Sequence, residues 1–214
     1  MFELIALILG IAAGIIQRRK IQPLLLERWR FWPLLPVMLA ACLLPALFAR
    51  YWPDLIWTDD RSLLISLLIF PFLIALALIA INVLPARLFT PRKPPILWYH
   101  RAALLIVAVG LIGEAAVLLL NHGYMPIPAS YLDDITDVAT IVGIRNQALY
   151  MKQLIGPDTV LPWLGQIWRA DWLTALKLSP FPYISTGETI VSIGLFLTGF
   201  SHFYTPKAKN QKGK

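Results

Sequence analysis

The stretch that decides how the rest of the chain is interpreted is Gly113-Glu114-Ala115-Ala116-Val117-Leu118-Leu119-Leu120-Asn121-His122-Gly123-Tyr124-Met125-Pro126. It places one carboxylate, that of Glu114, inside an otherwise apolar run. Two turns later the run ends in the polar corner Asn121-His122-Gly123, and Pro126 follows. Asn and Gly commonly end helices, and proline cannot continue one. The stretch therefore predicts an apolar helix that carries an ionisable group near its end and stops at a polar turn.

The composition of the whole chain points to a membrane protein. Of its 214 residues, 58% are hydrophobic and 14% are charged, whereas soluble domains carry roughly 25% charged residues. The apolar residues fall in long runs, as in helices that cross a bilayer. The net charge of +7 does not indicate nucleic acid, because the basic residues lie beside the apolar runs, where they direct membrane topology.

We predict an all-α integral membrane protein of five transmembrane helices that form one domain over residues 1–204. The predicted spans are residues 2–16, 31–49, 62–84, 102–120 and 184–204. A basic tail, residues 205–214, follows the last span, and we expect it to be mobile.

The distribution of basic residues sets the predicted orientation. If the N-terminus lies outside, the inner connectors and the tail hold 13 of the 19 Lys and Arg residues, and the outer segments hold the other six. Since an excess of Lys and Arg marks the cytoplasmic side, we predict the N-terminus outside and the C-terminus inside. The expected location is the inner membrane of a bacterial cell.

Residues 121–183 form the outer segment between the last two predicted spans. Unstructured loops of this length are uncommon, and the segment is rich in Trp and Pro. We predict a helical cap at the membrane interface, with Ser130 capping a helix that runs to Ile144 and a second helix over Asn146–Ile155.

Polar residues near the outer ends of the last two spans are candidates for a pocket. Glu114 lies about 9 Å inside the fourth span by helix rise, and Ser185, Glu188 and Ser192 share one helix face through their spacing. Ionisable groups inside membrane helices usually face the bundle interior or a wet cavity. The predicted polar pocket comprises Glu114, Asn121, His122, Ser185, Glu188 and Ser192.

Each of these residues also has a purely structural interpretation. Glu188 is placed where a helix dipole favours an acid. Glu114 fits a hydrogen bond to the cap, and His122 beside a glycine fits a helix end.

Small residues mark faces on which helices can approach closely. Ala6, Gly10 and Gly14 recur every fourth residue in the first span, a pattern common at contacts between membrane helices. Gly110 and Gly113 are the corresponding candidates in the fourth span.

No motif in the sequence indicates strong catalytic or metal chemistry. There is no CxxC pair and no His/Cys cluster with zinc-site spacing, and no cofactor is identified. We therefore expect a non-catalytic membrane subunit or accessory protein whose partners are membrane lipids and other membrane proteins. Two alternatives stay open: a carrier of a lipid or small molecule that uses Glu114 and Glu188, and an enzyme acting on lipid headgroups with Glu114 or His122 as general base.

Three motifs resemble a bacterial family of small multi-pass membrane proteins of unknown function. They are Asn121-His-Gly-Tyr-Met-Pro126, Thr159-Val-Leu-Pro-Trp-Leu-Gly165 and Ser185-Thr-Gly-Glu188. The chain departs from the family pattern at Gln166 and Glu188, where the resemblance implies Asp. A missing acid at position 166 argues against a metal or an acid–base pair there. The resemblance supports the fold and the importance of the outer corner, and it implies no activity.

Overall fold

The computed structural model of the chain is mostly helical. It describes residues 2–16, 61–84, 98–135, 138–145, 152–176 and 182–201. The predicted second span, residues 31–49, and the predicted mobile tail, residues 205–214, lie outside the described residues.

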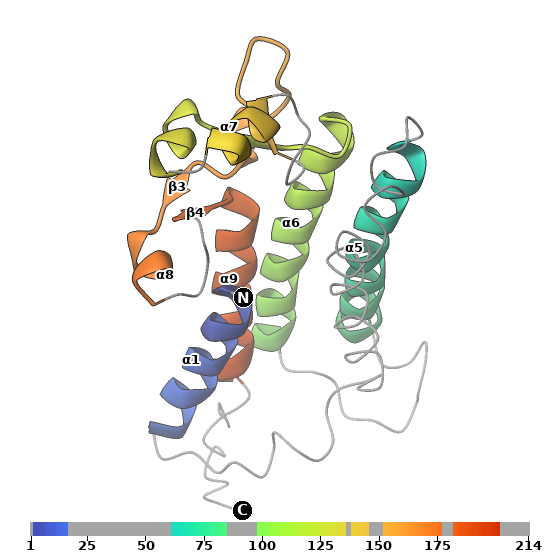
Figure 1. Ribbon diagram of the computed structural model, residues 1–214. Helices are drawn as coiled ribbons and strands as arrows, with labels where there is room; N and C mark the ends of the chain where they lie inside the picture. Colours follow the sequence, from blue (N-terminus) through green and yellow to red (C-terminus); the bar gives the residue numbers. More distant parts are fainter. Residues whose placement is uncertain are drawn as a thin grey trace, which may run out of the picture.

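Among the described residues, four long helices form a layered bundle (Figure 1). They are α1 (Phe2–Ile16), α5 (Arg61–Val83), α6 (Trp98–Leu120) and α9 (Thr186–Ser201). Helix α9 lies between α1 and α6, and α5 packs on α6. In Figure 1, α6 runs upward while α1, α5 and α9 run downward, so α6 is antiparallel to its neighbours.

The observed helices follow the predicted spans closely, with two differences at their beginnings. Helix α6 begins at Trp98, four residues earlier than predicted, because no proline follows Pro95 and the chain can continue the helix back through Tyr99. Helix α9 begins only at Thr186, because Tyr183–Ile184 belongs to a strand.

The prediction of five spans is not supported by the part of the chain that the structure describes. There, only α6 is long and apolar enough to cross a membrane, and the shorter apolar helices are Ile5–Ile16, Ile69–Val83 and Thr186–Phe200. One such helix is weak evidence for a membrane location, since the core helix of a soluble protein has the same length and composition.

Glycines bring α9 close to both of its neighbours. A Cβ added to Gly194 would lie 2.6 Å from Val107 Cγ2 of α6, and one added to Gly199 would lie 2.8 Å from the carbonyl oxygen of Leu7 in α1. Gly10 faces the backbone of Phe196. These three glycines are required by close backbone approach rather than by a special turn.

The small residues that the sequence proposed for helix packing make two kinds of contact. Ala6, Gly10 and Gly14 are all buried in α1. On α6, a Cβ at Gly110 would lie 2.7 Å from Val191 Cγ2, so this glycine lies in a helix contact. Gly113 instead faces the Leu164 side chain, 3.8 Å from an added Cβ, and thus contacts the cap rather than a helix.

The segment between α6 and α9 is a mixed cap with short strands, which corrects the prediction of a helical one. Its elements are β1 (Met125–Ile127), the 3-10 helix η2 (Ala129–Asp134), α7 (Val138–Arg145), β2 (Lys152–Leu154), η3 (Pro162–Leu164), β3 (Trp168–Arg169), α8 (Asp171–Ala175) and β4 (Tyr183–Ile184). Strand β1 pairs with β2 in parallel, and β3 pairs with β4 in antiparallel orientation.

Two predictions for the cap are wrong in detail. Ser130 lies inside η2, whose N-cap is Pro128, and the helix predicted to run from Ser130 to Ile144 is divided between η2 and α7. Lys152–Leu154, predicted as part of a helix, is strand β2 because its backbone pairs with β1. Pairing of this kind depends on a distant segment and overrides local helix preference.

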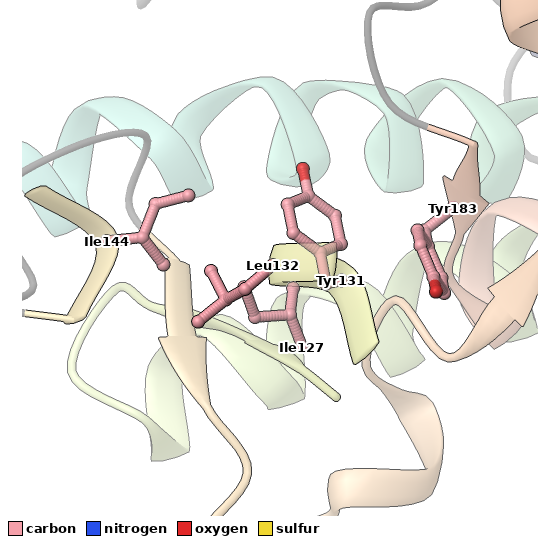
Figure 2. Close-up of a cluster of buried hydrophobic side chains, with 5 residues drawn as sticks. All are labelled: Ile127, Tyr131, Leu132, Ile144 and Tyr183. Atoms are coloured by element: carbon pink, nitrogen blue, oxygen red, sulfur yellow. The ribbon is translucent and has the colours of Figure 1, made fainter. Parts of the chain in front are cut away.

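The cap has a hydrophobic core of its own. Figure 2 shows its buried side chains, which come from η2, α7 and both strand pairs: Ile127, Tyr131, Leu132, Ile144 and Tyr183. The Tyr131 and Tyr183 rings lie 5.1 Å apart. A second cluster, formed by Val117, Leu118, Met125 and Leu164, joins the cap to the end of α6. The cap is therefore fixed on one end of the bundle.

Candidate functional site

The two acids of the predicted pocket, Glu114 and Glu188, meet where the end of α6 passes the beginning of α9. Because these helices are antiparallel, the last turns of α6 lie beside the first turn of α9 (Figure 1). Glu114 is on the buried face of α6, with 7% of its surface exposed. Glu188 is in the first turn of α9. The sequence placed both acids near the same surface, and the structure brings them together.

Ser185 and Glu188 form a reciprocal cap at the beginning of α9. The Glu188 backbone N–H donates to Ser185 Oγ at 2.8 Å, and the Ser185 N–H donates to Glu188 Oε2 at 2.8 Å. This is the capping box of a Ser-x-x-Glu sequence, which satisfies two backbone donors that a helix N-terminus leaves open. The Glu188 carboxylate is therefore engaged with its own helix end.

Glu114 fastens α6 to this capped helix end. Its Oε1 atom accepts hydrogen bonds from the Ser185 hydroxyl and, at 3.1 Å, from the Glu188 backbone N–H. A carboxylate is favoured here because the helix N-terminus carries a partial positive charge. We call Glu114, Ser185, Gly187 and Glu188 the α6–α9 clamp.

Gly187 makes room for the clamp. A Cβ at this position would lie 2.6 Å from Glu114 Cγ and 2.8 Å from Glu114 Cδ. Any side chain at residue 187 would thus displace the carboxylate from the helix end. The clamp depends on the absence of a side chain as much as on its hydrogen bonds.

Lys152, which the sequence analysis missed, supplies a positive charge beside the clamp. Its ammonium group donates to Gln166 Oε1 and lies 4.9 Å from the centre of the Tyr131 ring. Burial lowers the pKa of Lys152 to about 8, and the nearby Glu188 and Glu114 act in the opposite direction. Gln166 occupies the position where the resemblance implied Asp. The sequence signal for Lys152 was a single Lys among apolar and aromatic residues. It was missed because Lys152 was assigned to the predicted helix Asn146–Ile155.

Asn121 lies near the clamp in sequence but has a separate role. Its amide nitrogen donates to the carbonyl oxygens of Val117 at 2.9 Å and Val160 at 2.8 Å, and its side-chain oxygen accepts from the Val160 N–H at 2.9 Å. It therefore ties the end of α6 to the loop before η3. These bonds belong to the cap rather than to a pocket.

His122 and Ser192 do not join the clamp in any hydrogen bond that the structure describes. His122 is exposed and has a positive φ of 55°, and Gly123 follows with a φ of 88°. This is a left-handed helix end, in which the Gly123 N–H donates back to the Leu118 carbonyl oxygen. Ser192 lies two turns along α9 from Ser185 and is buried, and its hydroxyl has no hydrogen-bond partner among the described residues.

The predicted six-residue pocket is therefore divided in the structure. Glu114, Ser185 and Glu188 come together, Asn121 holds a cap loop, His122 is exposed, and Ser192 is buried further along α9. Within the described ranges, no group of three or more His, Cys, Asp or Glu residues could hold a metal ion. The clamp consists of acids that bind a helix end, which is an arrangement for joining helices.

These features define a helical protein with a small mixed cap and a buried carboxylate clamp between two antiparallel helices. Residues 94–200, half of the chain, match the family of unknown function DUF5317, and the chain belongs to this family. The match includes α6, the cap and α9, and hence every residue of the clamp. Neither the curated proteins nor the solved structures gave a match.

Proposed function

We propose that this protein is a multi-pass integral membrane protein of the bacterial inner membrane. In this proposal it acts as a non-catalytic subunit or accessory protein that packs with other membrane proteins or lipids. The cap lies on the outer side, as the distribution of Lys and Arg indicates.

The observation that carries the membrane proposal is an exposed apolar stripe along α6. Leu105, Val109, Ile112 and Leu119 are 50%, 60%, 55% and 51% exposed, and their spacing places them on one helix face. The helix rises about 33 Å from Trp98 to Leu120, close to the ~30 Å hydrocarbon core of a bilayer. A helix in the core of a soluble protein would cover such a stripe, whereas lipid covers it in a membrane.

The directions of the helices support several crossings. Five alternating spans with the N-terminus outside require the first, third and fifth spans to run one way and the fourth to run the other. Helices α1, α5 and α9 run opposite to α6 (Figure 1). The predicted second span lies outside the described residues.

The clamp supports a non-catalytic role. The acids that the sequence offered for chemistry accept hydrogen bonds from Ser185 and from the backbone at the beginning of α9. The third candidate, His122, is exposed at the left-handed end of α6. A general base needs its substrate within hydrogen-bond reach, and one oxygen of each carboxylate already accepts hydrogen bonds within the protein.

Isolation of the protein with its native lipid tests the proposal. Membranes of the host are washed at alkaline pH, solubilised in mild detergent, and the bound molecules identified by mass spectrometry. We expect the protein to stay in the washed membrane and to co-purify with membrane proteins at fixed stoichiometry. Release by the alkaline wash would contradict the membrane assignment, and isolation of the protein without any protein partner would contradict the accessory role.

A carrier is the second candidate, favoured by the position of Lys152 near the buried Glu114 and the half-buried Glu188. A mixed-charge group of this kind inside a membrane protein is a usual device for coupling proton movement to transport. If the isolated protein carries one lipid class and Glu114→Gln abolishes that association while the protein stays folded, the carrier reading replaces the accessory one. Retention of the protein partners by Glu114→Gln supports the accessory reading.

A further inference from the structure

The segment formed by β3 and α8, residues 168–176, projects large apolar side chains outward. Trp168, Trp172 and Leu176 are 54%, 41% and 64% exposed. Its strand β3 pairs with β4, and Tyr183 of β4 belongs to the hydrophobic core of the cap. Exposed apolar residues gathered on one short element mark a contact surface.

Hydrogen bonds fix the level of this segment relative to the helices. The Trp168 indole N–H donates to Thr186 Oγ1 at 2.9 Å, and Thr186 is the first residue of α9. The Thr186 hydroxyl donates in turn to the Trp163 carbonyl oxygen at 2.6 Å. In Figure 1, α8 lies below β3 and β4, level with the upper part of α9. The segment therefore reaches from the cap back to the depth at which α9 begins.

The charged groups of the segment are paired within the protein. Arg169 Nε lies 2.7 Å from Asp171 Oδ1, and its terminal nitrogen lies 3.2 Å from Asp134 Oδ1 in η2. Paired charges reduce the cost of placing the segment at a boundary between water and hydrocarbon. The bond to Asp134 also holds the segment to the cap.

We propose that the β3–α8 segment lies in the outer leaflet just beneath the headgroups, with Trp168, Trp172 and Leu176 among upper acyl chains. This inference rests on the proposed membrane function, and it specifies how deep this part of the cap lies in the bilayer. Its occupant is phospholipid, because Trp168 is bonded to the first residue of α9, which lies beside Glu114 of α6, and Ile112 of the exposed apolar stripe is in the same turn of α6 as Glu114. Trp98, 77% exposed, occupies the opposite end of that helix. Tryptophans at both ends of a span are the usual markers of the two membrane interfaces.

Fluorescence quenching of a labelled cysteine tests this depth. The single native cysteine is removed by Cys42→Ser, and Leu176→Cys, an exposed position, is labelled with a small polarity-sensitive fluorophore. The protein is placed in vesicles of phosphatidylcholine brominated near the glycerol end of the acyl chain. Ile112→Cys in the α6 stripe and Asp158→Cys on the exposed cap loop are the matched controls. Trp172→Cys provides a second position in the segment.

We expect the labels at 176 and 172 to be quenched by the brominated lipid and only weakly by aqueous iodide. The label at 158 should respond to iodide alone. Quenching by iodide and not by lipid at 176 and 172 would place the segment in water, and quenching by neither would mean that a second copy or another protein covers it. Both results overturn the inference, and both leave the proposed membrane location intact if the label at 112 is quenched by lipid. Quenching of the label at 112 by iodide would instead overturn the membrane proposal itself.

Discussion

The two halves of α9 are held by different kinds of contact. At its beginning, side-chain hydrogen bonds from Glu114, Ser185 and Glu188 join it to α6. Further along, Gly194 and Gly199 bring its backbone against α6 and α1. The first contact is directional and depends on particular atoms, and the second depends on the absence of side chains.

This difference predicts opposite failures. The first half of α9 should fail when a polar group is removed, because buried partners of that group lose hydrogen bonds. The second half of α9 should fail when side-chain volume is added at its contacts, because closely packed helices must move apart to accommodate it. Both kinds of contact join helices in a bilayer, where lipid is as apolar as the side chains and no hydrophobic effect drives helices together.

The largest expected effect comes from Glu114→Ala. The substitution removes the acceptor of the buried Ser185 hydroxyl and the second acceptor of the Glu188 N–H, which keeps its bond to Ser185 Oγ. We expect a cost of about 3 kcal/mol in the free energy of unfolding. Denaturation of the purified protein in mixed micelles measures it. Glu114→Gln keeps one acceptor oxygen and should lose less than half as much. Equal losses for both substitutions would contradict the clamp.

A smaller effect is expected from Gly110→Ala in the packed part of α6. The new Cβ would lie 2.7 Å from Val191 Cγ2 and 2.8 Å from the Gly187 carbonyl oxygen, which costs about 2 kcal/mol by overpacking. Gly113→Ala on the same helix is the matched control. Its Cβ would meet Leu164 at an ordinary 3.8 Å, and higher helix propensity should make it neutral or stabilising by up to ~1 kcal/mol. Denaturation in mixed micelles measures the free energy of unfolding of both variants. Equal changes for Gly110→Ala and Gly113→Ala would contradict the account of close packing at Gly110.

Lys152→Met should change how stability depends on pH. The pKa of Lys152 is about 8 in the folded protein and 10.5 in the unfolded chain. Between these values the unfolded chain holds a proton that the folded protein has released, so raising the pH favours folding through this group. The free energy of unfolding of the native protein should therefore rise relative to that of Lys152→Met between pH 8 and pH 10.5. Parallel curves for the two proteins would show that Lys152 is not desolvated.

The smallest effect is expected from His122→Gly. His122 has a φ of 55° and is exposed, so its imidazole has no buried contact to lose. Glycine adopts this left-handed conformation without strain, and a gain of about 0.5 kcal/mol is expected. Thermal unfolding is sensitive enough to detect it. A large loss of stability or of bound partners would show that His122 belongs to the site.

Local patterns made much of the helical part predictable. The apolar run Phe2–Ile16 coincides with α1, and the polar corner after Leu120 ends α6, because helix periodicity and helix-ending residues act within a few positions. The similar depths of Glu114 and Glu188 on the last two predicted spans indicated a common polar pocket, but the sequence did not determine whether the two acids meet. The Ser185-x-x-Glu188 capping box was present as a local signature but was read only as a dipole-favoured acid.

The cap could not be predicted in this way. Its strands are two or three residues long, and the pairing of β1 with β2 joins segments separated by η2 and α7. Such short segments carry too little periodicity to reveal themselves. The contact between Lys152 and Gln166 likewise depends on how the cap folds and not on spacing along the chain.

The central claim is that one face of α6 contacts lipid while the other holds the protein together. A spin label moved along α6 in the Cys42→Ser background measures it, by collisions with oxygen, which concentrates in lipid, and with a water-soluble nickel chelate. We predict oxygen maxima at Leu105, Val109, Ile112 and Leu119, with minima at Val107 and Val117 and little access of nickel at any of them. High nickel access along the stripe, or no helical period in the oxygen data, would contradict the account.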